Sequence, residues 1–344
     1  MDRVAELNGE PPPIAVVVRR GERVESEHRV TYAVAASDGR LLQVAGEVDR
    51  PIFPRSAIKP LQAIPLLESG AAERFALTDR ELALACASHS GEQEHIRLVQ
   101  EWLARLGLDG SALECGAHPP LHAAAAESLV ATGRSPERVH NNCSGKHAGM
   151  ITLARHLDVS VAGYSRADHP VQRRVAEVLR AMTGLAELEP PAVDGCGIPT
   201  FPVPLGLLAI AMARFAYPAD LPAERAQACA RLQAAMRAHP YLVAGTDRPC
   251  TEIMTAAPQV LVKAGAEGVY AACLPERRLA LVLKVADGGG RAAPVALLAL
   301  LQALDVLDAT ASDALTDRLR PELRNHAGVV VGRIEAAPGW PAWA

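Results

Sequence analysis

The sequence has few lysines and few aromatic residues. Only four of its 35 cationic side chains are lysines, and Phe, Trp and Tyr together make up 3% of the chain. So few aromatic rings argue against a stacking platform for nucleic-acid bases, and a net charge of −4 argues against a basic nucleic-acid-binding surface. The four lysines are Lys59, Lys146, Lys263 and Lys284. Because a buried lysine can lose its proton whereas arginine stays charged, each is either a candidate base or ligand, or a remnant of an arginine-rich composition.

The chain also lacks long hydrophobic runs and closely paired cysteines. No apolar stretch reaches the roughly 18 residues of a membrane-spanning helix, and the opening residues MDRVAELNGEPPP lack the apolar segment of a secretion signal. Its seven cysteines are scattered and form no C-x-x-C pair. These features predict a reduced, cytoplasmic protein that does not enter a membrane.

Segments rich in β-branched and aliphatic residues lie near both ends of the 344-residue chain. The early ones span residues 14–21, 29–39 and 40–48, and the late ones span 259–265, 268–274, 279–285 and 329–336. Between them, apolar residues recur with helical spacing, most clearly over 92–108, 168–184 and 222–239.

This order of segments predicts an α+β fold. We expect one antiparallel sheet built from both chain ends, about residues 14–50 and 258–336, together with a helical middle of about 56–257. Residues 14–336 are expected to form a single catalytic unit. A flexible N-terminal segment (1–13) would precede it and a C-terminal tail (337–344) would follow it.

Three segments carry candidate serine–lysine chemistry. FPRSAIKPLQ places Ser56 and Lys59 three residues apart, which is one face of a helix. A buried lysine with a lowered pKa can take the serine proton and make the oxygen a nucleophile. ACASHSGE offers Ser88 beside His89, which also allows a Ser-His-Asp triad, and VKAG places Lys263 at a strand end. Taken singly, each pattern also fits an ordinary helix cap or a solvated lysine.

Two glycine-containing segments carry the thiols of a candidate metal site. In HNNCSGKHAGM, Cys143, Lys146 and His147 share one face of a helix start. In DGCGIPTF, glycines flank Cys196 and allow a ligand to approach closely. Two thiolates and a nitrogen form a set that zinc accepts. Two buried free thiols are the alternative.

Together these motifs resemble the asparaginase II family, the zinc-associated L-asparaginases of the Rhizobium etli inducible type. FPRSAIKPLQ, the S-H-x-G-E element, NNCSGKHAGM, DGCGIPTF and VKAGAEGVY occur in the family's order, and with the flanking β segments the resemblance covers about residues 14–335. It implies a fold similar to serine β-lactamases and glutaminases, a homodimer, and one zinc ion per chain.

The resemblance also implies roles for individual positions. The catalytic positions would be two serine–lysine tandems, Ser56 with Lys59 and Ser88 with Lys263. The zinc ligands would be Cys143, Lys146 and Cys196. The substrate-binding positions would be Arg55, His147, Asp194 and Gly265.

The activity that the resemblance implies is hydrolysis of L-asparagine to L-aspartate and ammonia. Ser56 would attack the side-chain amide with Lys59 as base, Ser88 being the competing nucleophile, and water would then hydrolyse the aspartyl-enzyme. Zinc would position groups rather than activate water, because a serine is available; alternatively, its open position would polarise the substrate. The alternatives are a glutaminase or β-lactamase-like serine hydrolase of the same fold, and a zinc-binding protein with a degenerate site. The chain has no evident S-D-N triplet, which argues against a lactam substrate.

Overall fold

A computed structural model of the chain describes residues 10–343. Residues 1–9 of the predicted flexible N-terminal segment and the last residue of the predicted tail therefore lie outside the described residues. The chain divides into two compact units. The first contains the chain up to Ala57, Val203–Tyr217 and the chain from Glu252 onward, and the second contains Ile58–Pro202 and Pro218–Thr251.

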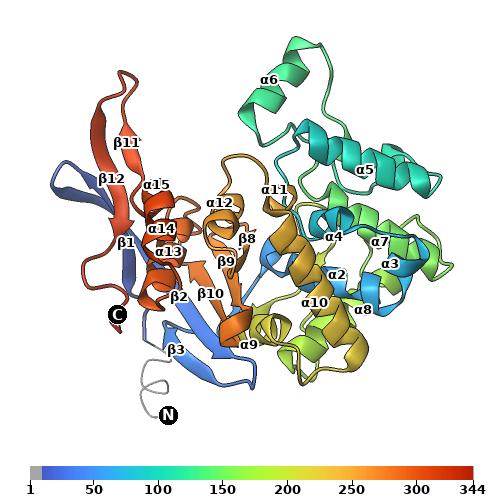
Figure 1. Cartoon of the computed structure of the whole chain (residues 1–344), viewed down its shortest axis with the longest axis horizontal. Coiled ribbons are helices and arrows are strands. Elements are labelled where there is room, and N and C mark those ends of the chain that lie inside the picture. The colour runs from blue at the N-terminus through green and yellow to red at the C-terminus, as the bar shows by residue number, and fades with distance from the viewer. Residues whose placement is uncertain (1–9, 344) are drawn as a thin grey trace. The chain divides into compact units, whose positions relative to one another are not determined.

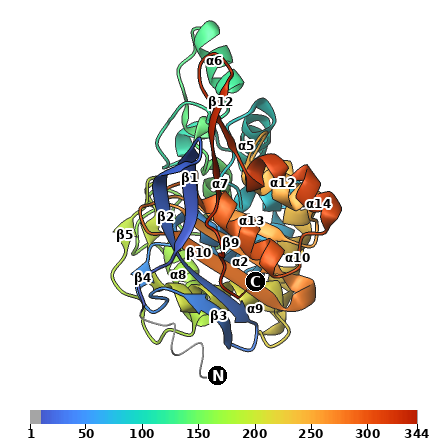
Figure 2. The ribbon, with the colours of Figure 1, turned by 90° about the vertical axis from the view of Figure 1, so that its left-hand side faces the viewer.

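The first unit is built on an eight-stranded sheet. Its strands are β1 (Ile14–Arg20), β2 (Arg23–Ala36), β3 (Leu41–Ala45), β8 (Leu261–Gly265), β9 (Val269–Leu274), β10 (Leu279–Val285), β11 (Glu322–Arg324) and β12 (Val330–Ala336). The order is β11-β12-β1-β2-β10-β9-β8, with β3 also paired to β2, and every pairing is antiparallel. Strands from the start of the chain thus lie between strands from its end (Figure 2). The predicted α+β class, with one antiparallel sheet from both chain ends, is confirmed.

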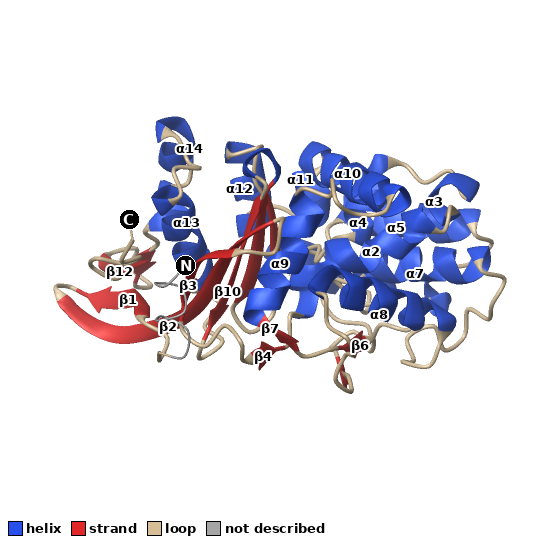
Figure 3. Ribbon diagram, turned by 90° about the horizontal axis from the view of Figure 1, so that it is seen from below, coloured by secondary structure: helices blue, strands red, loops and turns tan. Residues whose placement is uncertain are grey.

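Two apolar helices cover opposite faces of this sheet (Figure 3). Helix α9 (Leu205–Ala216) packs on β2, β9 and β10, and α13 (Ala293–Ala303) packs on β9, β10, β1 and β12. Nearly every residue of both helices is buried, because each lies between the sheet and further elements. Three further helices follow later in the chain: α12 (Pro249–Ala256), α14 (Ala309–Ala314) and α15 (Thr316–Leu319). Two short strands, β4 (Pro51–Ile52) and β7 (Val203–Pro204), pair with each other outside the large sheet.

The second unit is helical (Figure 1). Its helices are α2 (Lys59–Glu68), α3 (Ala71–Arg74), α4 (Asp79–Ala85), α5 (Gln93–Arg105), α6 (Ala123–Ala131), α7 (Ser144–His156), α8 (Pro170–Thr183), α10 (Ala223–Ala238) and α11 (Pro240–Val243). The predicted helices over 92–108, 168–184 and 222–239 appear as α5, α8 and α10. A two-stranded hairpin, β5 (Ala192–Val193) with β6 (Pro199–Thr200), completes the unit.

Helix α7 is the central element of this unit. Every residue from Ser144 to Ala154 is buried, and α7 packs against α2, α3, α4, α5 and α8. Gly145 permits the close packing on α4, since a Cβ there would lie 2.4 Å from the carbonyl oxygen of Leu84. The buried α7 carries Lys146 and His147 into the interior of the unit.

Candidate active site

The loop after α4 presents Ser88 in a fixed conformation. The backbone N–H of Ser88 donates to the carbonyl of Val243 at 2.9 Å, and that of His89 donates to the carbonyl of Asn142 at 3.1 Å. Ser90 Oγ donates to the carbonyl of Ala244 at 2.8 Å. Because the loop is held on two sides, the Ser88 side chain, 8% exposed, is preorganised.

Lys59 is the first residue of α2 and is fully buried. Its Nζ donates to Ser88 Oγ at 2.9 Å and lies 3.1 Å from Cys143 Sγ, and it also donates to the carbonyl of Ala87. Burial lowers the pKa of Lys59, against the opposing effect of the neighbouring thiol groups. An amine with a lowered pKa beside a serine hydroxyl is the arrangement that a lysine base requires.

The two predicted thiols lie together next to two lysines. Cys143 caps the start of α7 and hydrogen-bonds to Cys196, and Lys146 Nζ lies 3.0 Å from Cys196 Sγ. The hydrogen bond from Cys143 and the charge of Lys146 lower the pKa of the Cys196 thiol, whereas the same hydrogen bond and burial raise the pKa of Cys143. The neighbouring lysines therefore favour a negative charge on the thiol pair, and Cys196 is the thiol whose pKa is lowered.

A tight turn between β5 and β6 presents Cys196. The N–H of Asp194 donates to the carbonyl of Ile198, and the N–H of Gly197 donates to the carbonyl of Asp194, both at 2.8 Å. Gly197 has φ +91°, a conformation that favours glycine. The DGCG sequence thus forms the turn, and the half-buried Asp194 contributes to raising the pKa of Lys146.

His147 is held by Tyr164, and Tyr164 is held in turn by Glu114. No sequence motif singled out either residue. The Nδ1 of His147 lies 2.6 Å from the hydroxyl of Tyr164, which also accepts the backbone N–H of Glu114 at 2.8 Å. The Glu114 carboxylate in turn accepts the N–H groups of Gly163 and Ser165. Burial lowers the pKa of His147 to about 3, so the ring is neutral. Its buried Nε2 has no hydrogen-bond partner among the described residues.

His89 has a structural role. Its Nδ1 accepts the N–H of Gly91 at 3.2 Å and its Nε2 bonds with Ser144 Oγ at 2.9 Å. Both ring nitrogens are therefore engaged, and neither is available as a base for Ser88. These bonds argue against the Ser-His-Asp alternative and explain why a histidine in this loop is fully buried.

The first unit brings together four other predicted residues. Arg55 adopts φ +51°, a strained conformation for a residue with a side chain, directly before Ser56 in the 3-10 turn η1 (Arg55–Ile58). A Cβ on Gly265 would lie 2.7 Å from the carbonyl oxygen of Pro54, so the end of β8 contacts this turn closely. Lys263 lies two residues earlier on the same face of β8 and is 2% exposed.

The predicted residues thus fall into two groups. The second unit gathers Lys59, Ser88, Cys143, Lys146, His147, Asp194 and Cys196, and the first unit gathers Arg55, Ser56, Lys263 and Gly265. Within the second unit, the serine that Lys59 contacts is Ser88, a pairing that the sequence did not suggest. The predicted pairing of Ser88 with Lys263 stays a prediction.

Comparison with known protein families finds one whose model spans nearly the whole chain. The family model described as L-asparaginase II matches residues 16–336. The chain belongs to the L-asparaginase II family. Family membership supports an amidohydrolase, and no curated protein matches the chain.

Solved structures similar to this L-asparaginase II family member have low sequence identity to it. A beta-lactamase from Mycobacterium bovis is 14% identical, covers 84% of this chain and 94% of its own, and gives a TM-score of 0.42. A beta-lactamase/D-alanine carboxypeptidase from Pseudomonas syringae is 10% identical, covers 83% and 92%, and gives 0.35. Simvastatin synthase from Aspergillus terreus is 12% identical, covers 74% and 84%, and gives 0.38.

The thiol–amine cluster of this family member fits a metal ion. Among residues 10–343, no group of three or more His, Cys, Asp and Glu side chains is arranged to hold one. The cluster offers a different set, in which two sulfurs and the amine of Lys146 converge in a buried site. Sulfur and nitrogen are ligands that zinc prefers, so Cys143, Cys196 and Lys146 fit zinc once Lys146, whose pKa the neighbouring thiols raise, gives up its proton.

Proposed function

We propose that the protein is an L-asparaginase that hydrolyses L-asparagine through a serine acyl-enzyme. The observation that carries the proposal is the buried Lys59, whose amine has a lowered pKa and donates to Ser88 Oγ at 2.9 Å. Membership of the L-asparaginase II family supports the amide substrate. A neutral buried lysine beside a serine hydroxyl suits proton transfer during acylation.

In the proposed reaction, Ser56 Oγ attacks the side-chain amide carbon while Lys59, three residues later in the chain, takes the serine proton. Ser88, which accepts the hydrogen bond from Lys59, is the competing nucleophile. The carbon–nitrogen bond then breaks, and the nitrogen leaves as ammonia after receiving that proton. Water hydrolyses the aspartyl ester and releases L-aspartate, which regenerates the serine. The strained backbone at Arg55 supports this role for Ser56, because strain of this kind clusters at functional sites.

We further propose that Cys143, Lys146 and Cys196 hold one zinc ion per chain. Bound zinc would supply a cross-link between the start of α7 and the turn that carries Cys196. Cys143, Lys146 and Cys196 would then hold the surroundings of Lys59 in place, and the serine remains the nucleophile. The homodimer and the cytoplasmic location stay predictions from the sequence. Within the described residues, no helix is both long and apolar enough to span a membrane.

Ammonia release from a panel of amides tests the proposed activity. Purified, zinc-loaded protein is incubated with L-asparagine, L-glutamine and a chromogenic lactam. We expect the highest kcat/KM for L-asparagine. A preference for glutamine or the lactam would indicate a different hydrolase of the same fold, and no turnover of any substrate would indicate a degenerate zinc-binding protein.

A further inference from the structure

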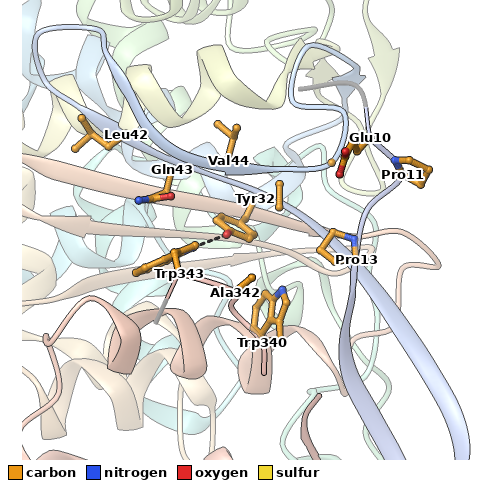
Figure 4. A pocket seen from close by; sticks show the side chains of 12 residues that line it. Glu10, Pro11, Pro13, Tyr32, Leu42, Gln43, Val44, Trp340, Ala342 and Trp343 are labelled. Atoms are coloured by element: carbon orange, nitrogen blue, oxygen red, sulfur yellow. Dashed lines mark hydrogen bonds between the residues drawn. The ribbon is translucent and has the colours of Figure 1, made fainter. Parts of the chain in front are cut away.

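A pocket in the first unit uses none of the residues assigned above. Its volume is about 320 Å³. It lies between β2 and β3, the segment following residue 10 and the C-terminal residues 340–343, as Figure 4 shows. This volume is at the small end of ligand-binding pockets, which suits a single small organic molecule.

Aromatic side chains are concentrated around this pocket. The whole chain has three Trp, five Tyr and four Phe, yet Tyr32, Trp340 and Trp343 all line it. Tyr32 and Trp340 meet edge to face, with ring centroids 6.0 Å apart and planes at 84°. The indole N–H of Trp343 donates to the Tyr32 hydroxyl and holds the C-terminal tail against the sheet (Figure 4). Trp340 and Trp343 are partly exposed and present indole surface to the pocket, whereas Tyr32, 2% exposed, packs behind them.

The lining residues carry negative charge and no positive charge. Glu10 is the one carboxylate among the lining residues, and they include no Lys, Arg or His. The buried Nε1 of Trp340 has no hydrogen-bond partner among the described residues. The pocket therefore offers π faces and a negative charge to a cation, and an N–H donor to a nearby oxygen.

We propose that this pocket binds a small organic cation, an ammonium with an apolar body that carries an oxygen acceptor. The cation lies against the indole rings of Trp340 and Trp343 and is attracted by the Glu10 carboxylate, and the oxygen accepts the Trp340 N–H. An anionic ligand is disfavoured, because it would meet a carboxylate and no cationic partner. The proposal does not depend on the asparaginase activity, because none of the proposed catalytic residues lines the pocket.

Tryptophan fluorescence of the full chain tests the proposal, with choline as the probe. Its matched control is the uncharged alcohol in which carbon replaces the choline nitrogen, since the two differ only in charge. The third tryptophan, Trp102, is fully buried in the second unit and supplies a constant background. We expect saturable quenching by choline with a Kd on the order of 1 mM or lower, and at least about tenfold weaker binding of the alcohol.

Two variants test the assigned side chains. Trp340→Leu removes a ring and the N–H donor, and is expected to weaken choline binding about tenfold or more while Trp343 still reports. Glu10→Gln alters an exposed side chain, so folding is unaffected, and is expected to weaken binding about threefold to tenfold. Glu276→Gln removes the same charge from another exposed site and should leave binding unchanged. Equal binding of choline and the alcohol, no quenching, or full retention of binding in Glu10→Gln would overturn the proposal.

Discussion

At the scale of single residues, chemistry depends on amines that can lose a proton. Three of the four lysines, Lys59, Lys146 and Lys263, belong to the candidate site, and all three are buried. Lys284 differs, since it is only half-buried, and its Nζ donates to the backbone carbonyls of Glu267 and Val285. Arginine keeps its proton, so it can replace Lys284 but not Lys59, which is the proposed base and whose pKa burial lowers.

Replacing Lys59 by arginine tests this distinction. We expect Lys59→Arg to lower kcat for asparagine at least about a hundredfold, because loss of a general base typically costs that much. Lys284→Arg keeps the charge and the donors and should retain near wild-type activity. Ammonia release measured for both variants, alongside thermal melts, checks this. Comparable activity in the two variants would show that Lys59 is not the base.

Replacing each serine separately tests the nucleophile. Ser56→Ala should abolish the burst of covalent aspartyl-enzyme and all turnover, while the melting temperature stays within a few degrees, because Ser56 is only partly buried. Ser88→Ala should retain slow acylation, since the Lys59 amine remains. Mass spectrometry after rapid acid quench detects the ester. An ester that forms in Ser56→Ala and not in Ser88→Ala would reassign the nucleophile to Ser88.

At the scale of elements, the position of α7 sets the geometry around Lys146. The helix contains two glycines one turn apart in different surroundings. A Cβ at Gly145 would lie 2.4 Å from the Leu84 carbonyl oxygen, whereas one at Gly149 would make an ordinary contact of 3.4 Å with Leu66. The first glycine is therefore needed for packing of α7 on α4, and the second is not.

These glycines give a matched pair of variants with opposite expected effects. Gly145→Ala should lower the free energy of unfolding by about 1–3 kcal/mol, because the backbone of α4 has to move. Gly149→Ala should raise it by up to about 1 kcal/mol, because alanine favours the helix. Urea denaturation followed by circular dichroism measures both. A stabilised Gly145→Ala variant would contradict the close packing of α7 on α4.

At the scale of the whole molecule, zinc would link segments far apart in the sequence. Cys143 and Cys196 lie 53 residues apart, yet they share a hydrogen bond in the second unit. An ion bound to the folded state and not to the unfolded chain stabilises the fold by mass action. The melting temperature of the protein should therefore depend on zinc.

Removing zinc with a chelator tests whether the ion stabilises the fold. A chelator should lower the melting temperature of the wild-type protein by several degrees and release about one zinc ion per chain, as counted by metal analysis. The Cys143→Ser and Cys196→Ser variants should show no such response. Cys229→Ser, which changes a buried thiol elsewhere in the second unit, should respond as the wild type does. A wild-type melt that ignores the chelator would exclude a stabilising zinc site.

Much of the site was predictable from local sequence. FPRSAIKPLQ, NNCSGKHAGM and DGCGIPTF each place their residues through short-range constraints, such as the 3-10 turn at Ser56, the start of α7 at Cys143 and the turn at Cys196. The sheet was predictable for a similar reason, since runs of β-branched and aliphatic residues indicate strands. β11 was missed because it has three largely exposed residues and no such pattern.

Sequence by itself therefore determined the elements, the fold class and the family, because these depend on local periodicity and on motifs of a few residues. Tertiary structure alone decided that Lys59 contacts Ser88, 29 residues away, and that Tyr164 holds His147. It also decided that Tyr32 from the start of the chain shares a pocket with Trp340 and Trp343 from its end. Hydrogen bonds and burial of this kind depend on how distant helices and strands pack, and packing leaves no short-range signal in the sequence.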